Sequence, residues 1–185
     1  MRSTGTRSAC PSLLLHICCG PCSTHVIESL RPRFDLVGFF YNPNIHPAEE
    51  YLRRVKDTSR VCRVYDIPLW IPPYCPEEWF SKVQGFENEP ERGRRCDLCF
   101  LMRLEETARY AQRVSIPWIG TTLTVSPRKD ATRVNEAGNR VAQNFGRSFV
   151  ADDFKKNNGF TKSVKMSTHL GLYRQGYCGC CYSKI

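Results

Sequence analysis

The sequence contains 11 cysteines, and most of them fall into three short groups. The members of the groups are Cys18, Cys19 and Cys22, then Cys96 and Cys99, and finally Cys178, Cys180 and Cys181. Grouped thiolates bind metal ions or iron-sulfur clusters, or exchange electrons by forming a disulfide. An odd number of cysteines, without an evident secretory signal, argues against a framework of structural disulfides. The groups therefore predict a metal or redox centre.

The spacing of the first two groups narrows the kind of centre. Residues three apart are neighbours on a helix, so Cys96 and Cys99 can hold one metal centre between them. The adjacent Cys18 and Cys19 diverge at the end of a predicted strand, which suits a cluster several ångströms across better than one tetrahedral zinc ion. An iron-sulfur cluster is therefore favoured over structural zinc, which stays open as an alternative.

The third group lies near the end of the sequence and has two interpretations. Cys178 and Cys180 form a C-x-C pair, which is either a further set of metal ligands or a dithiol that cycles through a strained disulfide. The three isolated cysteines, Cys10, Cys62 and Cys75, are expected to behave as small apolar side chains.

Other polar residues near these groups could take part in chemistry. His46 follows a predicted strand, and is either an acid, a base or a substrate contact, or a loop residue with only packing duties. Asp97 lies between Cys96 and Cys99, where an acid in the first turn of a helix is also common. The basic residues Arg92, Arg94 and Arg95 could neutralise a cluster or a phosphate. The hydroxyls of residues 121–126 suit sugar or phosphate contacts, or simply a strand and a turn.

The elements that must position these residues can be read from apolar periodicity. Short apolar runs predict strands at residues 12–19, 35–41, 67–71 and 118–125, with a fifth beginning at Phe149. Helices are predicted from Pro21 to Pro32, over 47–65, and from about 97 to 113 within a mostly helical segment 76–114. In the second of these helices the expected inward positions are Tyr51, Leu52, Val55 and Cys62. Roughly the last 30 residues are too rich in Gly, Ser and Lys to assign.

Strands that alternate with helices predict a parallel sheet covered by helices on both faces. We therefore expect a Rossmann-like (HUP-like) α/β fold. Ligands of such sheets gather at the carboxyl ends of the strands, where Cys18, Cys19 and Cys22 are placed. These thiols would also face the start of a helix, which lowers a cysteine pKa and favours the ligating thiolate.

Length and composition indicate a single globular unit. With 185 residues and 41% hydrophobic residues, the chain suits one domain over residues 13–185 after a flexible start at 1–12. No apolar run approaches the roughly 20 residues that span a bilayer, so no membrane association is expected. Without a recognisable export signal, the cytoplasm is the expected compartment.

The net charge of +9 is concentrated in the second half of the sequence. Residues 120–185 carry 11 Lys and Arg against 4 Asp and Glu. Such a distribution favours a polyanionic partner such as nucleic acid. A basic surface that is only solvated would give the same charge distribution, and stays open as an alternative. The loop after the first strand has a single glycine, Gly20, and a proline, and is therefore a poor phosphate-binding loop for ATP.

Five segments in this order resemble the QueH family of epoxyqueuosine reductases. They are residues 16–23 (HICCGPCS), 41–47 (YNPNIHP), 96–100 (CDLCF), 121–127 (TTLTVSP) and 171–180 (GLYRQGYCGC). Cys181 stands where the family tolerates other residues. The resemblance implies a bacterial enzyme that reduces the epoxide of epoxyqueuosine, at the wobble position of the tRNA anticodon loop, to a cyclopentene. Its partners would be that tRNA and an unidentified electron donor.

The family is described as carrying a 4Fe-4S cluster beside an additional mononuclear iron. By position, the resemblance assigns the cluster to Cys18, Cys19, Cys96 and Cys99. It makes Cys22 and Asp97 the candidate ligands of the second iron. Cys178 and Cys180 become a redox-active pair or additional ligands. His46 is a further catalytic candidate because of its position after a predicted strand. Two other functions stay open: a zinc-stabilised RNA-binding protein without catalysis, and an ATP-dependent tRNA-modifying enzyme of the thiolase type.

Overall fold

A computed structural model describes residues 10–183 of the chain. The predicted flexible start at residues 1–12 falls mostly outside this range, and Ser12 is already the first residue of a strand. Within residues 10–183, no helix has both the length and the apolar character needed to cross a membrane.

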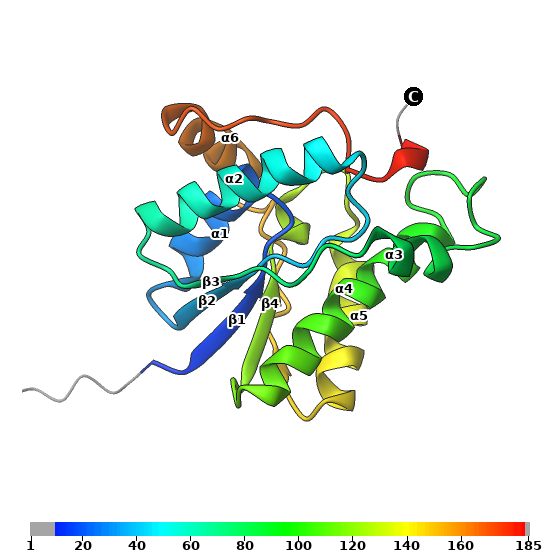
Figure 1. The fold of residues 1–185 in the computed structure, drawn as a ribbon. Helices are drawn as coiled ribbons and strands as arrows, with labels where there is room; N and C mark the ends of the chain where they lie inside the picture. Colours follow the sequence, from blue (N-terminus) through cyan, green and yellow to red (C-terminus); the bar gives the residue numbers. More distant parts are fainter. Residues whose placement is uncertain (1–9, 184–185) are drawn as a thin grey trace, which may run out of the picture.

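A five-stranded parallel sheet forms the centre of the structure (Figure 1). In the order of the sheet the strands are β3 (Leu69–Trp70), β2 (Asp35–Phe39), β1 (Ser12–His16), β4 (Trp118–Thr121) and β5 (Ser148–Phe149). Every neighbouring pair is parallel. The predicted Rossmann-like α/β fold is therefore confirmed.

Helices cover both faces of this sheet (Figure 1). On one face lie α1 (Gly20–Leu30), α2 (Ala48–Val64) and α6 (Gly159–His169), and on the other α4 (Arg94–Arg113) and α5 (Ala131–Asn144). The short elements are α3 (Pro76–Lys82) and the 3-10 turns η1 (Leu123–Val125) and η2 (Cys181–Ser183).

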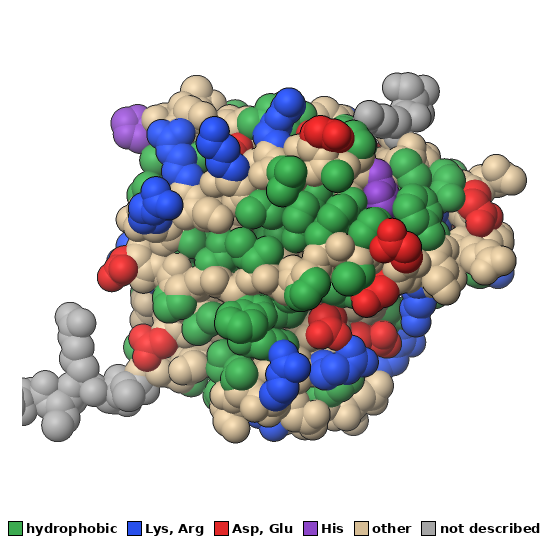
Figure 2. Space-filling view, in the orientation of Figure 1, with side chains coloured by type: hydrophobic (Ala, Val, Ile, Leu, Met, Phe, Trp, Pro, Cys, Tyr) green, Lys and Arg blue, Asp and Glu red, His purple; other side chains and the backbone are tan. Residues whose placement is uncertain are grey.

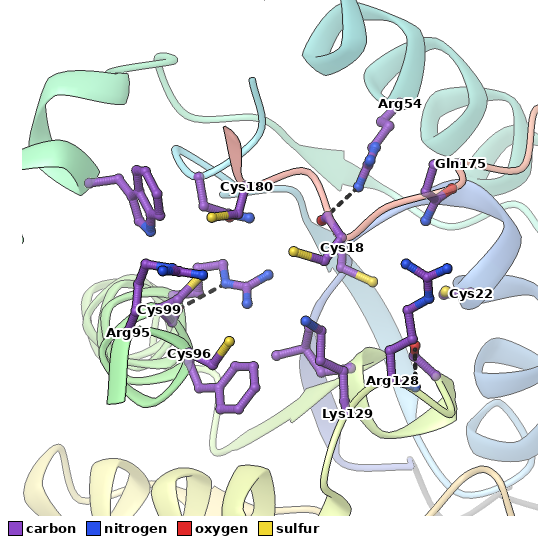
Figure 3. A pocket seen from close by; sticks show the side chains of 17 residues that line it. Cys18, Cys22, Arg54, Arg95, Cys96, Cys99, Arg128, Lys129, Gln175 and Cys180 are labelled. Atoms are coloured by element: carbon purple, nitrogen blue, oxygen red, sulfur yellow. Dashed lines mark hydrogen bonds between the residues drawn. The ribbon is translucent and has the colours of Figure 1, made fainter. Parts of the chain in front are cut away.

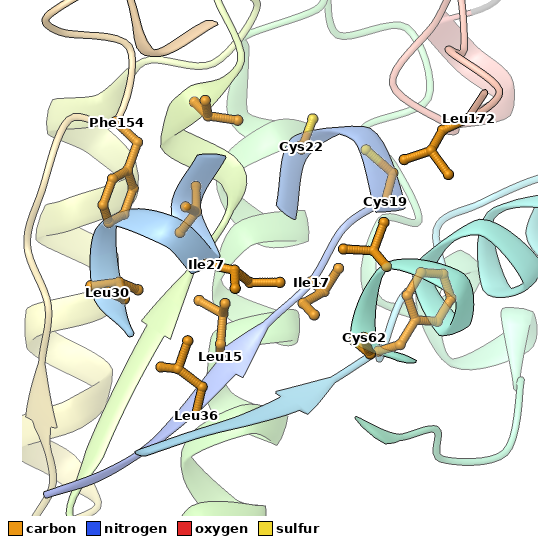
Figure 4. Packing of buried hydrophobic residues seen from close by; sticks show 14 of the residues in the cluster. Leu15, Ile17, Cys19, Cys22, Ile27, Leu30, Leu36, Cys62, Phe154 and Leu172 are labelled. Atoms are coloured by element: carbon orange, nitrogen blue, oxygen red, sulfur yellow. The ribbon is translucent and has the colours of Figure 1, made fainter. Parts of the chain in front are cut away.

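Alternating side chains of the central strand divide the core into two layers. Leu13 and Leu15, together with Ile17 just after the strand, pack in the layer beneath α1, whereas Leu14 belongs to the layer beneath α4 and α5. All four side chains are at most 1% exposed, as expected of a strand that is buried on both faces. Figure 4 shows the first layer, with the start of α1 at its upper edge.

The strand register places the functional segments at one edge of the sheet. His16, the last residue of β1, pairs with Phe39 of β2 and with Thr121 of β4. The segments that follow these three strands therefore leave the sheet side by side. They contain the first cysteine group, the predicted loop of His46 and the hydroxyl-rich segment after β4.

The start of α1 requires a glycine and tolerates a proline. A Cβ on Gly20 would lie 2.8 Å from the carbonyl carbon of Asp57, so only glycine allows α1 to approach α2 this closely. Pro21 occupies the first turn, where its missing N–H costs no helical hydrogen bond. This close approach fixes the first cysteine group against α2.

Several boundaries and one burial prediction differ from the sequence analysis. The strands predicted at 12–19 and 118–125 are shorter, because the chain turns into α1 and into η1 after them. No element had been assigned to the residues that form α5 and α6. Leu52 was predicted to face inward, and this was wrong: its side chain is 63% exposed. Figure 2 shows apolar side chains in a broad band across the face of the molecule on which α2 lies.

Candidate metal centre

The three cysteines of the first group meet at the start of α1. Their sulfur atoms all lie within 4.8 Å of one another. Cys19 is the residue before the helix and has an extended backbone, with φ −169° and ψ 157°, while Cys22 lies in the first helical turn. The change from extended to helical backbone therefore turns the three thiols toward a common point.

Hydrogen bonds from two other segments hold two of these sulfurs. The Thr122 hydroxyl accepts the backbone N–H of Cys18 at 3.1 Å and donates to the Cys18 Sγ at 3.3 Å. The Gln175 side-chain amide donates to the Cys19 Sγ at 3.0 Å. The first group is therefore positioned by the segment after β4 and by the C-terminal segment as well as by its own backbone.

The same cysteines have unequal proton affinities. Hydrogen bonds from the Cys19 and Cys22 thiols hold the pKa of Cys18 well below its usual value. The contact with Cys18 raises the pKa of Cys19 to about 12, and it raises the pKa of Cys22 well above the ordinary value. Of the three thiols, Cys18 is therefore the one that loses its proton most readily.

The second group projects from the first turns of α4. Cys96 and Cys99 are both buried, and the backbone N–H of Arg92 donates to the Cys96 sulfur at 3.2 Å. Cys18 packs against the apolar cluster of Cys96, Phe100, Leu123 and Val134, and cysteines of the first two groups line the same cavity. Burial raises the pKa of the Cys99 thiol.

The third group reaches the site on a loop that α2 and the segment after β2 hold in place. The Arg54 guanidinium donates to the carbonyl oxygens of Cys178, at 3.0 Å, and Tyr177, at 3.2 Å. The backbone N–H of His46 donates to the carbonyl of Gly179 at 2.8 Å. Gly179 has φ +110°, and a Cβ there would lie 2.9 Å from the Ile45 side chain, so this position requires glycine. Hydrogen bonding from Cys180 lowers the pKa of Cys178 and raises that of Cys180.

One cavity collects thiols from all three groups (Figure 3). Its cysteines are Cys18, Cys22, Cys96, Cys99, Cys178 and Cys180, and its basic residues are Arg54, Arg95, Arg103, Arg128 and Lys129. Among the described residues that line it, none is an Asp or Glu. Figure 3 shows Cys96 and Cys99 on the α4 side, Cys18 near the middle, and Cys22 with Gln175 on the opposite side.

The cavity also contains buried polar atoms that lack a partner. Asn44 and Trp79 line it, and both the Asn44 Oδ1 and the Trp79 Nε1 are buried without a hydrogen bond in the described structure. Buried polar groups are normally paired, so an unpaired acceptor and donor indicate a polar occupant. Several thiols that can serve as ligands, the surrounding cations and an unused N–H donor together fit a sulfur-ligated, negatively charged metal cluster.

Three predicted site residues, Cys19, Asp97 and His46, do not line this cavity, and the last two lie apart from it. The Asp97 carboxylate pairs with the Arg133 guanidinium and lines a separate hollow between α4 and α5. His46 does not line the cavity either: its ring stacks on Phe80, with centroids 4.6 Å apart, and also contacts Trp79. Burial lowers the pKa of His46. Through its backbone N–H, His46 contacts the loop of the third cysteine group at Gly179.

The sequence analysis missed several residues that line the cavity. Arg103 lies four positions after Cys99, hence on the same face of α4, and that spacing could have revealed it. Its guanidinium donates to the Cys99 carbonyl at 3.0 Å. Arg54 and Lys129 also line the cavity, but both are far in sequence from every cysteine group that lines it. Their spacing in the sequence therefore gave no indication that they belong to the site. Arg95, noted as a possible source of neutralising charge, does line the cavity.

The fold and the cavity define the class of protein: a Rossmann-like α/β protein with a thiol-rich site at the carboxyl edge of its sheet. Residues 13–185 match the model of the family described as epoxyqueuosine reductase QueH. The chain therefore belongs to the epoxyqueuosine reductase QueH family, and the predicted resemblance is confirmed.

Curated relatives share this description. The chain is 38% identical to epoxyqueuosine reductase QueH of Streptococcus pyogenes serotype M1, over 94% of this chain and 70% of the relative. It is 40% identical to the Acinetobacter baylyi protein of the same name, over 92% and 79%. The Thermotoga maritima protein of that name is 33% identical, over 94% and 91%.

A solved structure supports the fold. U34-tRNA thiolase NcsA from Methanococcus maripaludis, solved with its [4Fe-4S] cluster, matches with a TM-score of 0.58 at 13% sequence identity. The match covers 96% of this chain and 63% of the thiolase chain. At this identity the likeness concerns the fold alone.

Proposed function

We propose that this protein is an epoxyqueuosine reductase that acts on the modified wobble nucleoside of tRNA. In this reaction the epoxide takes up two electrons and two protons, both of its C–O bonds break, a C=C bond forms and water leaves. The observation that carries the proposal is the cavity in which six thiols from three segments meet, in a chain of the QueH family. The named relatives carry the same activity in their descriptions.

Cys18, Cys19, Cys96 and Cys99 are the proposed ligands of a 4Fe-4S cluster. When bound, such a cluster supplies electrons one at a time at a potential that the surrounding protein sets. The contact between Cys18 and the apolar cluster around Cys96 supports a shared site, and the nearby guanidinium groups would offset the charge of four thiolates. Cys19 is fully buried, and its sulfur lies within 4.8 Å of the sulfurs of Cys18 and Cys22.

An additional mononuclear iron remains part of the proposal. Cys22 is its candidate ligand, since it lies on the cavity wall within reach of the other two thiols. Asp97 could join it only by leaving Arg133 and turning around α4, so we no longer place it in the site. His46 is likewise proposed as a positioning residue, through its backbone hydrogen bond to Gly179.

Cys178 and Cys180 are proposed as a redox pair. Oxidation of two thiols to one disulfide releases two electrons and two protons, which is the number that the epoxide consumes. The low pKa of Cys178 and the hydrogen bond from Cys180 favour one thiolate and one thiol, the state from which such a pair reacts. The external electron donor, of unknown identity, would return the disulfide to its thiols after each turnover.

The proposed partner is the anticodon loop of a tRNA. Residues 120–185 carry most of the excess positive charge, and they supply Arg128 and Lys129 to the cavity wall. An unstacked base in a single-stranded loop is the form of RNA that a protein can draw into such a cavity. We propose that the protein acts in the cytoplasm, where tRNA and reduced thiols are found.

Turnover of epoxyqueuosine-containing tRNA by the anaerobically reconstituted protein tests the proposal. With a chemical reductant and no nucleotide, queuosine should appear in digests of the tRNA. A reaction that needs ATP would support a thiolase-type enzyme instead. Bound zinc without sulfide, together with tRNA binding and no product, would support a zinc-stabilised RNA-binding protein.

A further inference from the structure

A second hollow adjoins the cysteine cavity and has a different character. It is lined by Pro21, Cys22, Ser126, Pro127, Arg128, Phe160, Arg174 and Gln175. Cys22, Ser126, Arg128 and Gln175 line both spaces, so these residues form a common wall. Whatever occupies the hollow is therefore in contact with residues of the reactive cavity.

The walls of this hollow come from four segments that hydrogen bonds hold together. The Ser163 hydroxyl of α6 donates to the Pro21 carbonyl of α1 at 2.6 Å, and both residues are buried. On the opposite wall, the Arg92 guanidinium donates to the carbonyls of Pro127, at 3.1 Å, and Arg128, at 3.3 Å. The hollow is thus built on braced elements rather than on a free loop.

The side chains in the hollow combine a flat surface with positive charge. The Arg174 guanidinium lies over the Phe160 ring, 5.4 Å from its centroid, and donates to the Ser167 hydroxyl at 2.8 Å. Arg128 supplies a second cation at the shared wall. In the described part of the chain, neither Arg128 nor Arg174 forms an ion pair, and no acidic residue lines the hollow.

This combination matches the chemistry of a nucleotide. Bases stack on aromatic rings and on arginine planes, and phosphates pair with arginine. We propose that the hollow binds the nucleotide next to the reacting one in a single-stranded RNA loop. Its base stacks on the Arg174–Phe160 pair and its phosphate meets Arg128. The inference rests on the proposed function, because RNA is the substrate of that function.

Binding of an anticodon stem-loop RNA to the reconstituted protein, measured by fluorescence anisotropy over a series of salt concentrations, tests this assignment. Phe160→Leu removes the ring, and should weaken binding at least about fivefold with little change in the salt slope. Phe160→Tyr keeps a ring and should bind within about twofold of the wild type. Arg128→Gln should lower the slope of log Kd against log salt by about 0.7, the value for one lost phosphate contact with a single strand.

A matched charge control is available on α4. Arg113 is exposed and ends this 20-residue helix, so it lies roughly 28 Å along the axis from the end that bears the cysteines. Arg113→Gln removes the same charge and should leave both Kd and slope nearly unchanged. Equal slopes for Arg128→Gln and Arg113→Gln, or wild-type affinity of Phe160→Leu, would overturn the assignment.

The experiments give different results when the nucleotide-binding assignment is wrong and when the proposed reductase activity is wrong. A wild-type protein that binds the hairpin through these residues, but produces no queuosine, contradicts the function and keeps the binding site. A protein that produces queuosine, while Phe160→Leu keeps the wild-type affinity and Arg128→Gln keeps the wild-type salt slope, contradicts the binding site alone. Unchanged iron content and absorption spectra of the variants show that the cysteine site is intact in each.

Discussion

Replacing Arg54 with methionine should destabilise the protein and loosen the third cysteine group. Arg54 is 2% exposed, and its guanidinium pairs with Glu50 at 2.7 Å as well as with the carbonyls of Cys178 and Tyr177. Methionine fills a similar volume, but it leaves the Glu50 carboxylate, itself 7% exposed, without its cation. Removing one partner of a buried ion pair costs about 3–5 kcal/mol.

The double variant separates the two contributions. In Glu50→Gln/Arg54→Met neither charge of this pair remains, and the hydrogen bonds to the two carbonyls are lost. The double variant should therefore recover about 2 kcal/mol relative to Arg54→Met. Arg54→Lys keeps the charge but lacks the planar fork, and should fall between the wild type and Arg54→Met.

Urea unfolding of the metal-free protein under reducing conditions measures these differences. With a slope of about 2 kcal/mol per molar urea, Arg54→Met should lower the midpoint by roughly 2 M. A cost below about 1 kcal/mol, or a double variant no more stable than Arg54→Met, would refute the assignment of Arg54 as a buried, charge-paired clamp.

Three other predictions follow from the site. Gly179→Ala should cost about 2–4 kcal/mol, because alanine is strained at φ +110° and its Cβ meets Ile45; a near-neutral change in urea unfolding would contradict this. Burial and a neighbouring arginine lower the pKa of His16 to about 3, so unfolding takes up a proton between about pH 6.5 and 3. Wild-type stability should thus fall by about 1.4 kcal/mol per pH unit below 6.5, and His16→Asn should lack this part of the slope; equal slopes would count against a neutral buried imidazole. Oxidation of the metal-free protein should link Cys178 to Cys180 in peptide maps, and a disulfide between other cysteines would argue against the proposed redox pair.

The sheet and most of its helices were predictable because their apolar periods are regular. Leu13 to Ile17 alternate between two buried layers, and strands of this kind appear in the sequence as continuous apolar runs. Helix α5 also has the apolar spacing of a helix, with Val134, Ala137 and Val141 on its buried face after an Asp130 N-cap. The sequence analysis did not predict this helix, although its pattern was sufficient.

Other features had no signal in the sequence. Helix α6 buries Gly159, Ser163 and Ser167, so small polar residues make its contacts and no apolar stripe marks it. Within the site, the cysteine groups could be recognised by spacing, but their convergence depends on three segments far apart in the chain. Asp97 illustrates the limit: it follows Cys96 directly, yet one residue turns a helix by about 100°, and its carboxylate reaches α5 instead.

Iron and sulfide analysis of cysteine variants tests the central claim that separate cysteine groups hold one cluster. After anaerobic reconstitution, the wild type should contain roughly four irons or more with matching sulfide. Cys18→Ala and Cys96→Ala should each lose most of both, whereas Cys62→Ala, which removes a buried thiol outside the cavity lining, should retain them. Stoichiometric zinc without sulfide in the wild type, or full iron and sulfide in Cys96→Ala, would contradict the account.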